Sequence, residues 1–321
     1  MKTNEQGSAG MQDLDEFTVT EAALAQMRAT PEPRLREIMD AAVRHLHAFA
    51  REVNLTPDEW LAGIGFLTEV GHACTPYRQE FILLSDVLGV SALVNLLHDK
   101  TAAEKPTDTS LLGPFYRDGA PELALGDSIC RTPPTRELLF HGRILDASGR
   151  PVPGARIQVW QTDESGLYDL QSAGPDMMDM RGNFTADGSG NYHFRTAPAQ
   201  DYPVPLDGPV GRLVMRQGRH GHRPAHFHFL IAAPGHRELV TALYLADSPH
   251  IGSDTVFGVA RSLIVTPTNN DPGAPLPGLP SVRYDFRLSR AAAGESGRVG
   301  TDPARIVPVQ VVPSNAVSAA G

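Results

Sequence analysis

The sequence predicts a mainly β protein with an α-helical N-terminal region, in which helices precede an antiparallel β-sandwich. Two observations indicate this fold class. Between residues 20 and 100 apolar side chains recur with helical periodicity. After Lys105 short runs of β-forming residues alternate with turns rich in Gly, Pro, Asp and Ser, without helical patterns between them. We expect a polar N-terminal tail over residues 1–18, a helical domain over 19–105, a β-sandwich domain over 106–292 and a C-terminal tail over 293–321.

Composition and charge exclude several classes of protein. The 321 residues are 41% hydrophobic and 20% charged, with a formal net charge of −9, which is typical of a globular protein with one large domain or two moderate ones. The acidic balance argues against nucleic acid as a partner. Only two cysteines occur, Cys74 and Cys130, which argues against a disulfide framework or a cysteine zinc site. The first residues lack the apolar core of a secretory signal, and no apolar run is long enough for a bilayer, so we expect a cytoplasmic protein and no membrane partner.

The predicted helices differ in how apolar they are. Residues 34–53 place a broad apolar stripe opposite charged side chains, as an amphipathic helix does. A second helix is expected to begin after Thr56, a capping residue, with Pro57 at its first position. The stretch "EFILLSDVLGVSALVNLLHD", residues 80–99, is the most apolar helix. Its surplus of Leu and Val indicates a surface between domains or between subunits.

The predicted strands include residues 138–146, 155–163, 191–196 and 226–233. The last of them contains the sequence "HFHF". Because successive side chains of a strand point to opposite faces, His226 and His228 should share one face while Phe227 and Phe229 occupy the other. Two imidazoles on one face are able to hold a metal ion.

Two tyrosines that adjoin turns are candidate partners of these histidines. Tyr168 and Tyr202 are expected on loops that converge on the strand. Two phenols with two imidazoles would be unusual zinc ligands, whereas phenolate stabilises ferric iron and imidazole also suits iron. Taken singly, each feature has a simpler interpretation. The histidines, with His220 and His222 nearby, would form a histidine-rich edge, and each tyrosine would be a half-buried aromatic.

The whole set of motifs resembles one family. The segments "LLGPFYRDGAP", "GRPVPGARIQVWQTDESGLYDLQ", "GNYHFRT", "YPVPLDGPVG" and "HRPAHFHFLIAAPGHRELVT" together resemble the intradiol ring-cleaving aromatic dioxygenases, the catechol and hydroxyquinol 1,2-dioxygenases. The resemblance covers roughly residues 20 to 290. Within the family, "SDTVFGVARSLIV" and "EFILLSDVLGVS" are more similar to the hydroxyquinol branch.

The resemblance implies a non-haem Fe(III) ion bound by Tyr168, Tyr202, His226 and His228, with water or hydroxide as the fifth ligand. It further implies that Tyr202 leaves the metal when substrate chelates, and that the reaction needs O2 but no nicotinamide. The N-terminal helices would form a homodimer interface and hold a phospholipid in an apolar tunnel. This agrees with the surplus of apolar residues in the helical region.

Arg223 occupies the position where the family keeps a guanidinium against the reacting ring, so we expect a catalytic role through electrostatic stabilisation. Arg219 and Arg237 are expected to be surface charges. One position departs from the catechol-type pattern, because Ala242 stands where those enzymes carry a glutamine. The alanine side chain donates no hydrogen bond, so a third substrate hydroxyl, a water or another side chain must supply the hydrogen bond that the glutamine makes in those enzymes.

Asp86 is a candidate acceptor for a third ring hydroxyl, and a site with such a buried acceptor penalises the substrate that lacks the hydroxyl. The alternative is an aspartate on a helix surface beside Ser85. Hydroxyquinol, benzene-1,2,4-triol, is therefore the preferred substrate, with catechol or a substituted catechol as the alternative.

A non-catalytic β-sandwich binding protein is the competing class, and a heteromeric protocatechuate-type enzyme is disfavoured by the long helical region. The expected substrate-binding residues are Leu83, Asp86, Leu112, Gly113, Pro114, Phe115, Val256 and Phe257.

Overall fold

The structure is a computed structural model that describes residues 14–75, 78–99, 105–172 and 177–291. Most of the expected N-terminal tail, residues 1–18, and all of the expected C-terminal tail, residues 293–321, lie outside the described residues. The chain forms two compact units, Met1–Thr68 and Glu69–Gly321. The boundary between the units falls within helix α3, and the domain limits drawn from the sequence stay predictions.

The first unit contains α1 (Thr18–Met27), α2 (Pro33–Glu52) and most of α3 (Pro57–Ala73). Helix α1 packs against α2, and Arg51 on α2 donates a hydrogen bond to the hydroxyl of Thr20 over 3.1 Å. The predicted cap of α3 is confirmed as a reciprocal capping box. The Glu59 amide donates to the Thr56 hydroxyl over 3.3 Å, and the Thr56 amide donates to the Glu59 carboxylate over 3.0 Å.

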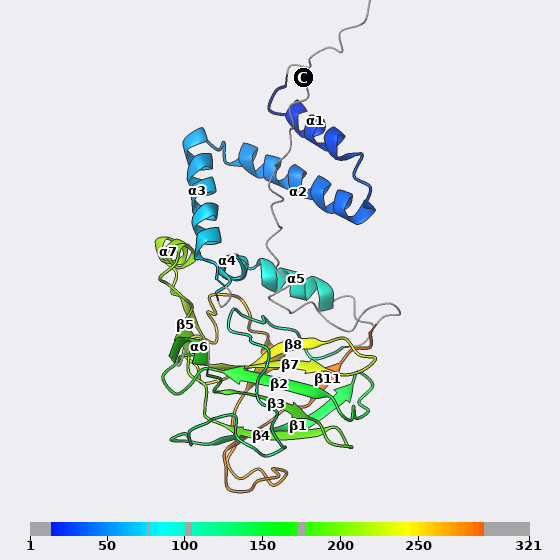
Figure 1. The fold of residues 1–321 in the computed structure, drawn as a ribbon, viewed down its shortest axis with the longest axis vertical. Helices are drawn as coiled ribbons and strands as arrows, with labels where there is room; N and C mark the ends of the chain where they lie inside the picture. Colours follow the sequence, from blue (N-terminus) through cyan, green and yellow to red (C-terminus); the bar gives the residue numbers. More distant parts are fainter. Residues whose placement is uncertain (1–13, 76–77, 100–104, 173–176, 292–321) are drawn as a thin grey trace, which may run out of the picture. The chain divides into compact units, whose positions relative to one another are not determined.

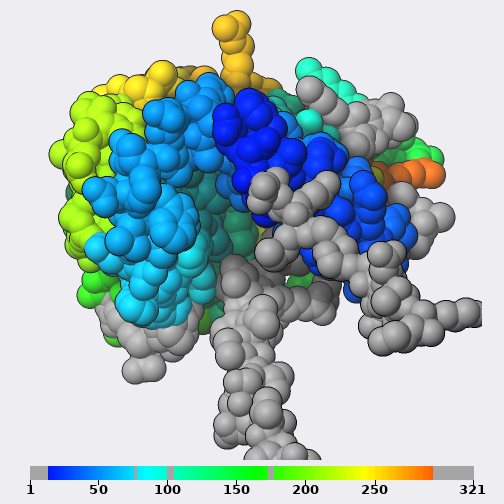
Figure 2. Space-filling view, turned by 90° about the horizontal axis from the view of Figure 1, so that it is seen from above, coloured from blue at the N-terminus to red at the C-terminus, as the bar shows by residue number. Residues whose placement is uncertain are grey.

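Helix α2 is amphipathic as predicted, but its apolar stripe is exposed. Figure 2 shows α2 in blue in the space-filling view, and no residue of this helix is buried. The large apolar side chains that remain exposed along it are Leu35, Ile38, Met39, Leu46 and Phe49.

The second unit begins with two helices where the sequence predicted one. Helix α4 (Glu80–Val87) and helix α5 (Val90–Asp99) meet at an angle of 73°. Gly89 lies between them with φ +75°, a left-handed conformation that glycine adopts without steric cost. The prediction of one continuous helix was therefore wrong, because Gly89 ends the first helix. Among the described residues no single helix is long and apolar enough to cross a membrane. The bent pair of α4 and α5 has the length and the apolar composition of a membrane span only when the two helices are taken together.

Two sheets form the predicted sandwich (Figure 1). One contains β1 (Leu138–Asp146), β4 (Asn191–Thr196), β10 (Ser281–Arg283) and β11 (Phe286–Leu288). The other has the order β3 (Arg181–Thr185), β2 (Arg156–Gln161), β7 (His226–Ala232), β8 (Leu239–Leu245) and β9 (Ile264–Val265). A separate ribbon pairs β5 (Tyr202–Pro203) with β6 (His222–Arg223). The remaining elements are α6 (Asp169–Ser172), α7 (Pro209–Arg216) and the short helix η1 (Arg261–Leu263).

The long strand pairs are antiparallel, as expected. Three short pairs are parallel instead: β10 and β11 with β1, and β9 with β8. Parallel partners need a crossover rather than a tight hairpin, and these short strands come late in the chain after extended loops. The sheets are therefore mixed, a detail that the sequence did not indicate.

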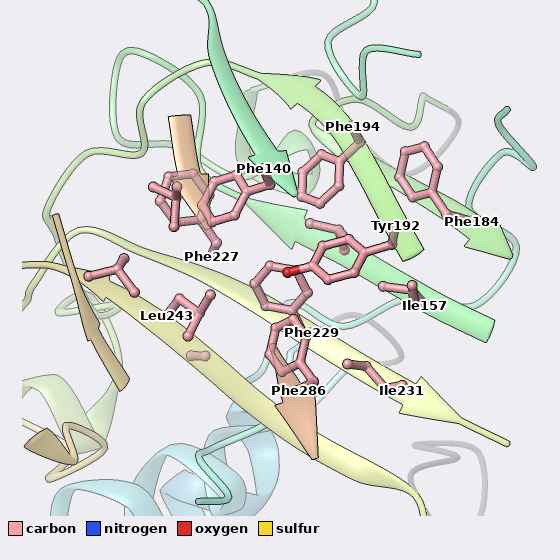
Figure 3. Packing of buried hydrophobic residues seen from close by; sticks show 14 of the residues in the cluster. Phe140, Ile157, Phe184, Tyr192, Phe194, Phe227, Phe229, Ile231, Leu243 and Phe286 are labelled. Carbon is pink, nitrogen blue, oxygen red and sulfur yellow. The ribbon is translucent and has the colours of Figure 1, made fainter. Parts of the chain in front are cut away.

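The core lies between the two sheets (Figure 3). Phe140 of β1 meets Phe227 of β7 with ring centroids 4.5 Å apart and Phe229 with centroids 5.9 Å apart. These aromatic contacts use the face of β7 that the sequence assigned to the phenylalanines. The opposite face of β7 is thereby left for the histidines.

Candidate metal centre

Four side chains with metal-binding atoms converge on the outer face of β7. The phenol oxygens of Tyr168 and Tyr202 lie 3.3 Å apart, and the Tyr168 oxygen lies 3.5 Å from Nε2 of His226. The Nε2 atoms of His226 and His228 lie 3.0 Å apart. All four side chains are buried, with at most 3% of any residue exposed. These separations suit four donors around one ion, because iron or zinc binds nitrogen and oxygen ligands at about 2.0–2.2 Å.

The strand positions both histidines, as its alternation predicted. His226 and His228 lie on the same face of β7, and His228 stacks on Trp160 of the neighbouring strand β2, with centroids 4.9 Å apart. Nδ1 of His226 lies 2.6 Å from the carbonyl oxygen of Pro224. A carbonyl only accepts hydrogen bonds, so Nδ1 carries the proton and Nε2 presents its lone pair to the cluster.

Different local structures position the two tyrosines. Tyr168 lies on a loop directly before α6, as predicted, whereas Tyr202 is the first residue of strand β5 rather than a loop residue. The ring of Phe115 stacks on Tyr168 with centroids 4.3 Å apart. Asp169, the next residue along the chain, accepts a hydrogen bond from Nε of the buried Arg181 over 2.7 Å. This ion pair fixes the segment that presents Tyr168.

The electrostatic environment favours metal binding by neutral imidazoles. Burial, with the Arg223 charge as a further cause, lowers the pKa of His226 well below its usual value, and burial with its charged neighbours does the same for the pKa of His228. Burial raises the pKa of Tyr168 well above its usual value and also raises the pKa of Tyr202. A cation among the four atoms would reverse the effect on the phenols, because it stabilises phenolate. The donor set therefore fits a trivalent ion with two anionic oxygen ligands.

Arg223 lies beside the cluster with its charge buried. It is 3% exposed, and its Nη1 lies 3.1 Å from Nε2 of His226. Its register partner in the β5–β6 ribbon is Tyr202. Asp254 compensates its charge, with Nε of Arg223 3.2 Å from the carboxylate. The structure thus brings the predicted catalytic arginine to the predicted ligands.

Three residues near Arg223 were missed by the sequence interpretation: Asp254, Tyr244 and Gly258. Arg223 donates a hydrogen bond to the Tyr244 hydroxyl over 3.1 Å. The Gly258 amide donates to Asp254 over 2.9 Å, and a Cβ at residue 258 would lie 2.7 Å from the Tyr244 oxygen. Alternation along β8 could have indicated Tyr244, because it lies two residues after Ala242 on the same face. Asp254 and Gly258 lie within the segment "SDTVFGVARSLIV", which resembles the hydroxyquinol branch, but no local pattern indicated that they lie against Arg223.

The expected substrate-binding residues divide into four groups. Gly113 has φ +73°, and a Cβ there would lie 3.4 Å from the His228 ring, while Phe115 contacts Tyr168. Leu83, Asp86 and Val256 are buried, at 2%, 4% and 2% exposure. Phe257 is 55% exposed and lies against Gly89. The remaining two, Leu112 and Pro114, flank Gly113 and are partly buried.

Asp86 is buried rather than exposed on the helix surface. Burial raises its pKa to about 6, while a hydrogen bond from Ser91 and the charge of Arg223 oppose this shift. The expectation that Arg219 is a surface charge was wrong. The side chain of Arg219, which is only half-buried, reaches two segments and donates hydrogen bonds to the carbonyl oxygens of Val87, over 2.9 Å, and Thr255, over 2.6 Å. Arg237 is also half-buried.

Comparisons with known proteins agree with this architecture. Residues 112–290 match a family model described as dioxygenase, and residues 32–105 match the catechol dioxygenase N terminus. The chain is 45% identical to 6-chlorohydroxyquinol 1,2-dioxygenase of Cupriavidus pinatubonensis, over 79% of this chain and 92% of that protein. It is 46% identical to hydroxyquinol 1,2-dioxygenase of a Rhizobium species, over 76% of this chain and 83% of that protein. The solved structure of hydroxyquinol 1,2-dioxygenase from Pseudomonas putida superposes with a TM-score of 0.78 at 40% identity, covering 86% of this chain and 99% of that one.

The fold and the buried donor cluster define a class, that of β-sandwich enzymes with a non-haem metal centre. The chain belongs to the intradiol ring-cleavage dioxygenase family. Enzymes of this family use non-haem iron, so a non-catalytic binding protein is excluded as the class of this chain.

Proposed function

We propose that this enzyme cleaves the ring of hydroxyquinol with O2, between the two ortho-hydroxylated carbons, to give maleylacetate through 3-hydroxy-cis,cis-muconate. We propose Tyr168, Tyr202, His226 and His228 as the ligands of Fe(III). The observation that carries the proposal is the convergence of four buried donor atoms, 3.0–3.5 Å apart where adjacent, beside a buried guanidinium. Two phenolates and two neutral imidazoles are the donor set that ferric iron prefers.

Bound Fe(III) would supply Lewis-acid chemistry, withdrawing electron density from a chelated diol so that the ring carbon reacts with O2. The protein residues around it would orient the substrate and move protons. Tyr202 faces Arg223 in the ribbon and would accept a proton from a substrate hydroxyl. Arg223, fixed by Asp254 and Tyr244, would stabilise negative charge that develops on the ring and its oxygens.

Two observations favour the triol over catechol. The curated relatives named above are hydroxyquinol-type enzymes. Asp86 is a buried carboxyl on α4, coupled electrostatically to Arg223, and it would accept a hydrogen bond from the third hydroxyl. Catechol leaves one acceptor position of this carboxyl unfilled, beside the position that Ser91 occupies, which costs binding energy in the transition state.

The test is a visible absorption spectrum of the purified protein, recorded alone and then anaerobically with benzene-1,2,4-triol or with catechol. We expect a red-brown tyrosinate-to-iron band that shifts to longer wavelength with the triol. A shift with both diols would favour a broad catechol 1,2-dioxygenase that forms cis,cis-muconate. A protein that stays colourless after iron reconstitution would overturn the four-ligand centre.

Matched variants separate the ligands from other buried tyrosines. Tyr168→Phe should lose the band and most of the bound iron. Tyr192→Phe is the control, because Tyr192 is 1% exposed and its hydroxyl donates to the Tyr284 carbonyl, outside the donor cluster. The control should keep the band even where it loses stability.

We propose in addition that the N-terminal helices form a homodimer interface and hold a phospholipid. The exposed apolar stripe of α2 supports this, because monomers rarely leave a continuous apolar face in water. Light scattering should give the mass of two chains, and mass spectrometry of an organic extract should detect the lipid.

A cytoplasmic location stays a prediction, consistent with the two free cysteines.

A further inference from the structure

A second group of potential metal ligands lies at the outer end of the β5–β6 ribbon. It consists of Asp201, His222 and His250, whose ligand atoms all lie within 4.8 Å of one another. Nδ1 of His222 lies 3.4 Å from Oδ2 of Asp201, and Nε2 of His250 lies 3.6 Å from the same oxygen. The two imidazole rings stack, with centroids 4.6 Å apart.

These atoms are close together without forming hydrogen bonds that would account for their arrangement. Nδ1 of His222 is buried and has no hydrogen-bond partner. Unsatisfied buried nitrogen atoms are uncommon, and an unplaced ion is one of their ordinary explanations. A nitrogen without a partner that faces a carboxylate and a second imidazole is in a position to coordinate a cation.

The spacing suits a tetrahedral ion. Zn²⁺ binds imidazole nitrogen and carboxylate oxygen at about 2.0–2.2 Å, so two ligand atoms of one tetrahedral site lie roughly 3.3–3.6 Å apart. The two distances to the Asp201 oxygen fall within this range. The side chains of Asp201, His222 and His250 are 31%, 40% and 25% exposed, so a water molecule can complete the coordination.

We propose that Asp201, His222 and His250 bind one Zn²⁺ ion, at a site separate from the iron centre. The donor set separates the two sites chemically. Two imidazoles with one carboxylate suit zinc, whereas two phenols with two imidazoles suit ferric iron. Hard ions such as Mg²⁺ prefer sites made of oxygen atoms and would bind here poorly.

Zinc at this position would cross-link two parts of the molecule. Asp201 directly precedes Tyr202 on β5, and His222 pairs with Pro203 from β6. His250 belongs to the loop that follows β8. A bound ion therefore ties the ribbon that carries Tyr202 and Arg223 to the rest of the sandwich, and should stabilise the folded protein by mass action.

His220 provides a matched control within the same patch. Its ring centroid lies 4.9 Å from that of His250, but its Nδ1 already accepts a hydrogen bond from the His222 amide over 3.2 Å. It is not one of the three residues whose ligand atoms all lie within 4.8 Å of one another. His220→Ala removes one histidine from the patch and leaves the three proposed ligands in place.

The experiment uses iron-loaded protein dialysed against Zn²⁺, with Mg²⁺ as the comparison ion, and measures both metals by elemental analysis and zinc affinity by calorimetry. We expect one zinc per chain with iron content unchanged, no Mg²⁺ binding, and a melting temperature that rises with zinc. His250→Ala and Asp201→Asn should each weaken zinc binding at least tenfold, whereas His220→Ala should change it less than threefold.

Three results would overturn the site. The first is that the iron-loaded protein binds no zinc, and the second is that it binds zinc only as it loses iron. The third is an equal loss of zinc affinity in His220→Ala and His250→Ala, which would indicate an unspecific histidine patch. His250→Gln keeps similar size and serves where His250→Ala does not fold. The iron band, recorded on the same samples, reports the proposed iron centre independently of zinc.

Discussion

Arg223 and Tyr244 are joined by a hydrogen bond of 3.1 Å inside the protein, where Arg223 is only 3% exposed. The Tyr244 hydroxyl also lies 2.8 Å from that of Ser110. Tyr244 is the register partner of His226, and Ala242 is the register partner of His228. The polar partner that Ala242 cannot supply thus comes from the same strand face, two residues further along β8.

Replacing Tyr244 by phenylalanine should lower kcat/KM about 10- to 100-fold while the fold is kept. The variant removes a hydrogen bond to a charged group, which is worth about 1.5–3 kcal/mol, and leaves Asp254 to hold Arg223 without the tyrosine, so the guanidinium is oriented less firmly toward the reacting ring. Burial raises the pKa of Tyr244 to about 12, so the hydroxyl remains protonated in neutral buffer. Steady-state kinetics with the triol measure the change.

The comparison for this variant is Tyr192→Phe, which also removes a buried tyrosine hydroxyl, but one that lies on β4 of the other sheet and donates to the Tyr284 carbonyl. It should lower the melting temperature without a specific loss of turnover. Equal activity of the two variants would contradict a positioning role for Tyr244.

Gly258 should not tolerate even one added carbon atom. A Cβ at this position would lie 2.7 Å from the Tyr244 oxygen and 3.0 Å from an Arg223 nitrogen. Gly258→Ala is therefore expected to displace the arginine and reduce kcat at least tenfold. Gly252→Ala is the matched control, since a Cβ there meets nothing within 4 Å. Kinetics of both variants at saturating triol test this, and an unaffected Gly258→Ala enzyme would show that the local geometry relaxes freely.

The sequence predicted the parts of the site that depend on local periodicity. The positions of His226 and His228 follow from strand alternation, and the cap at Thr56 follows from local hydrogen bonding. Local patterns could not show that Tyr168 and Tyr202 approach within 3.3 Å of each other, because that contact depends on loop paths set by the whole sandwich. The contacts of Asp254 and Gly258 with Arg223 depend in the same way on a loop from a distant part of the chain. The break at Gly89 was missed because apolar periodicity continues across it.

The Arg181–Asp169 ion pair should be a large contributor to stability. The two side chains are 2% and 0% exposed. Arg181→Met leaves the buried carboxylate with Arg117 as its remaining cationic partner, 3.3 Å away, so the loss should lie near the lower end of the range for breaking a buried pair, about 3 kcal/mol. Arg156→Met breaks a comparable pair with Glu122 on the surface, where the side chains are 57% and 63% exposed, and should cost less than about 1 kcal/mol. Urea unfolding of both variants measures the difference.

A double variant, Arg181→Met with Asp169→Asn, should recover part of the lost stability because it removes the buried charge as well as its partner. If it is no more stable than Arg181→Met alone, the lost contact of Arg181 with the Phe115 carbonyl accounts for the effect rather than the weaker pairing of the Asp169 charge.

Asp86→Asn should increase stability at pH 7 while reducing discrimination between substrates. Burial raises the pKa of Asp86 from 3.8 to about 6, so the folded protein holds this proton more tightly than the unfolded chain. Its contribution to stability is therefore greatest below pH 3.8 and falls as the pH rises through about 6. The neutral amide avoids the cost of ionisation, which is roughly 3 kcal/mol at most at pH 7.

The measurement is urea unfolding of the wild type and Asp86→Asn at pH 7 and pH 4, with the gain expected only at pH 7. Asp187→Asn is the control of opposite sign. Hydrogen bonds from Asn191 lower the pKa of the exposed Asp187, so that variant should lose stability at pH 7.

In parallel, the ratio of kcat/KM for benzene-1,2,4-triol over catechol should fall about tenfold in Asp86→Asn, because the amide is a weaker acceptor than a carboxylate. An unchanged ratio together with the expected gain in stability would remove Asp86 from substrate recognition and leave its burial as a structural feature of α4.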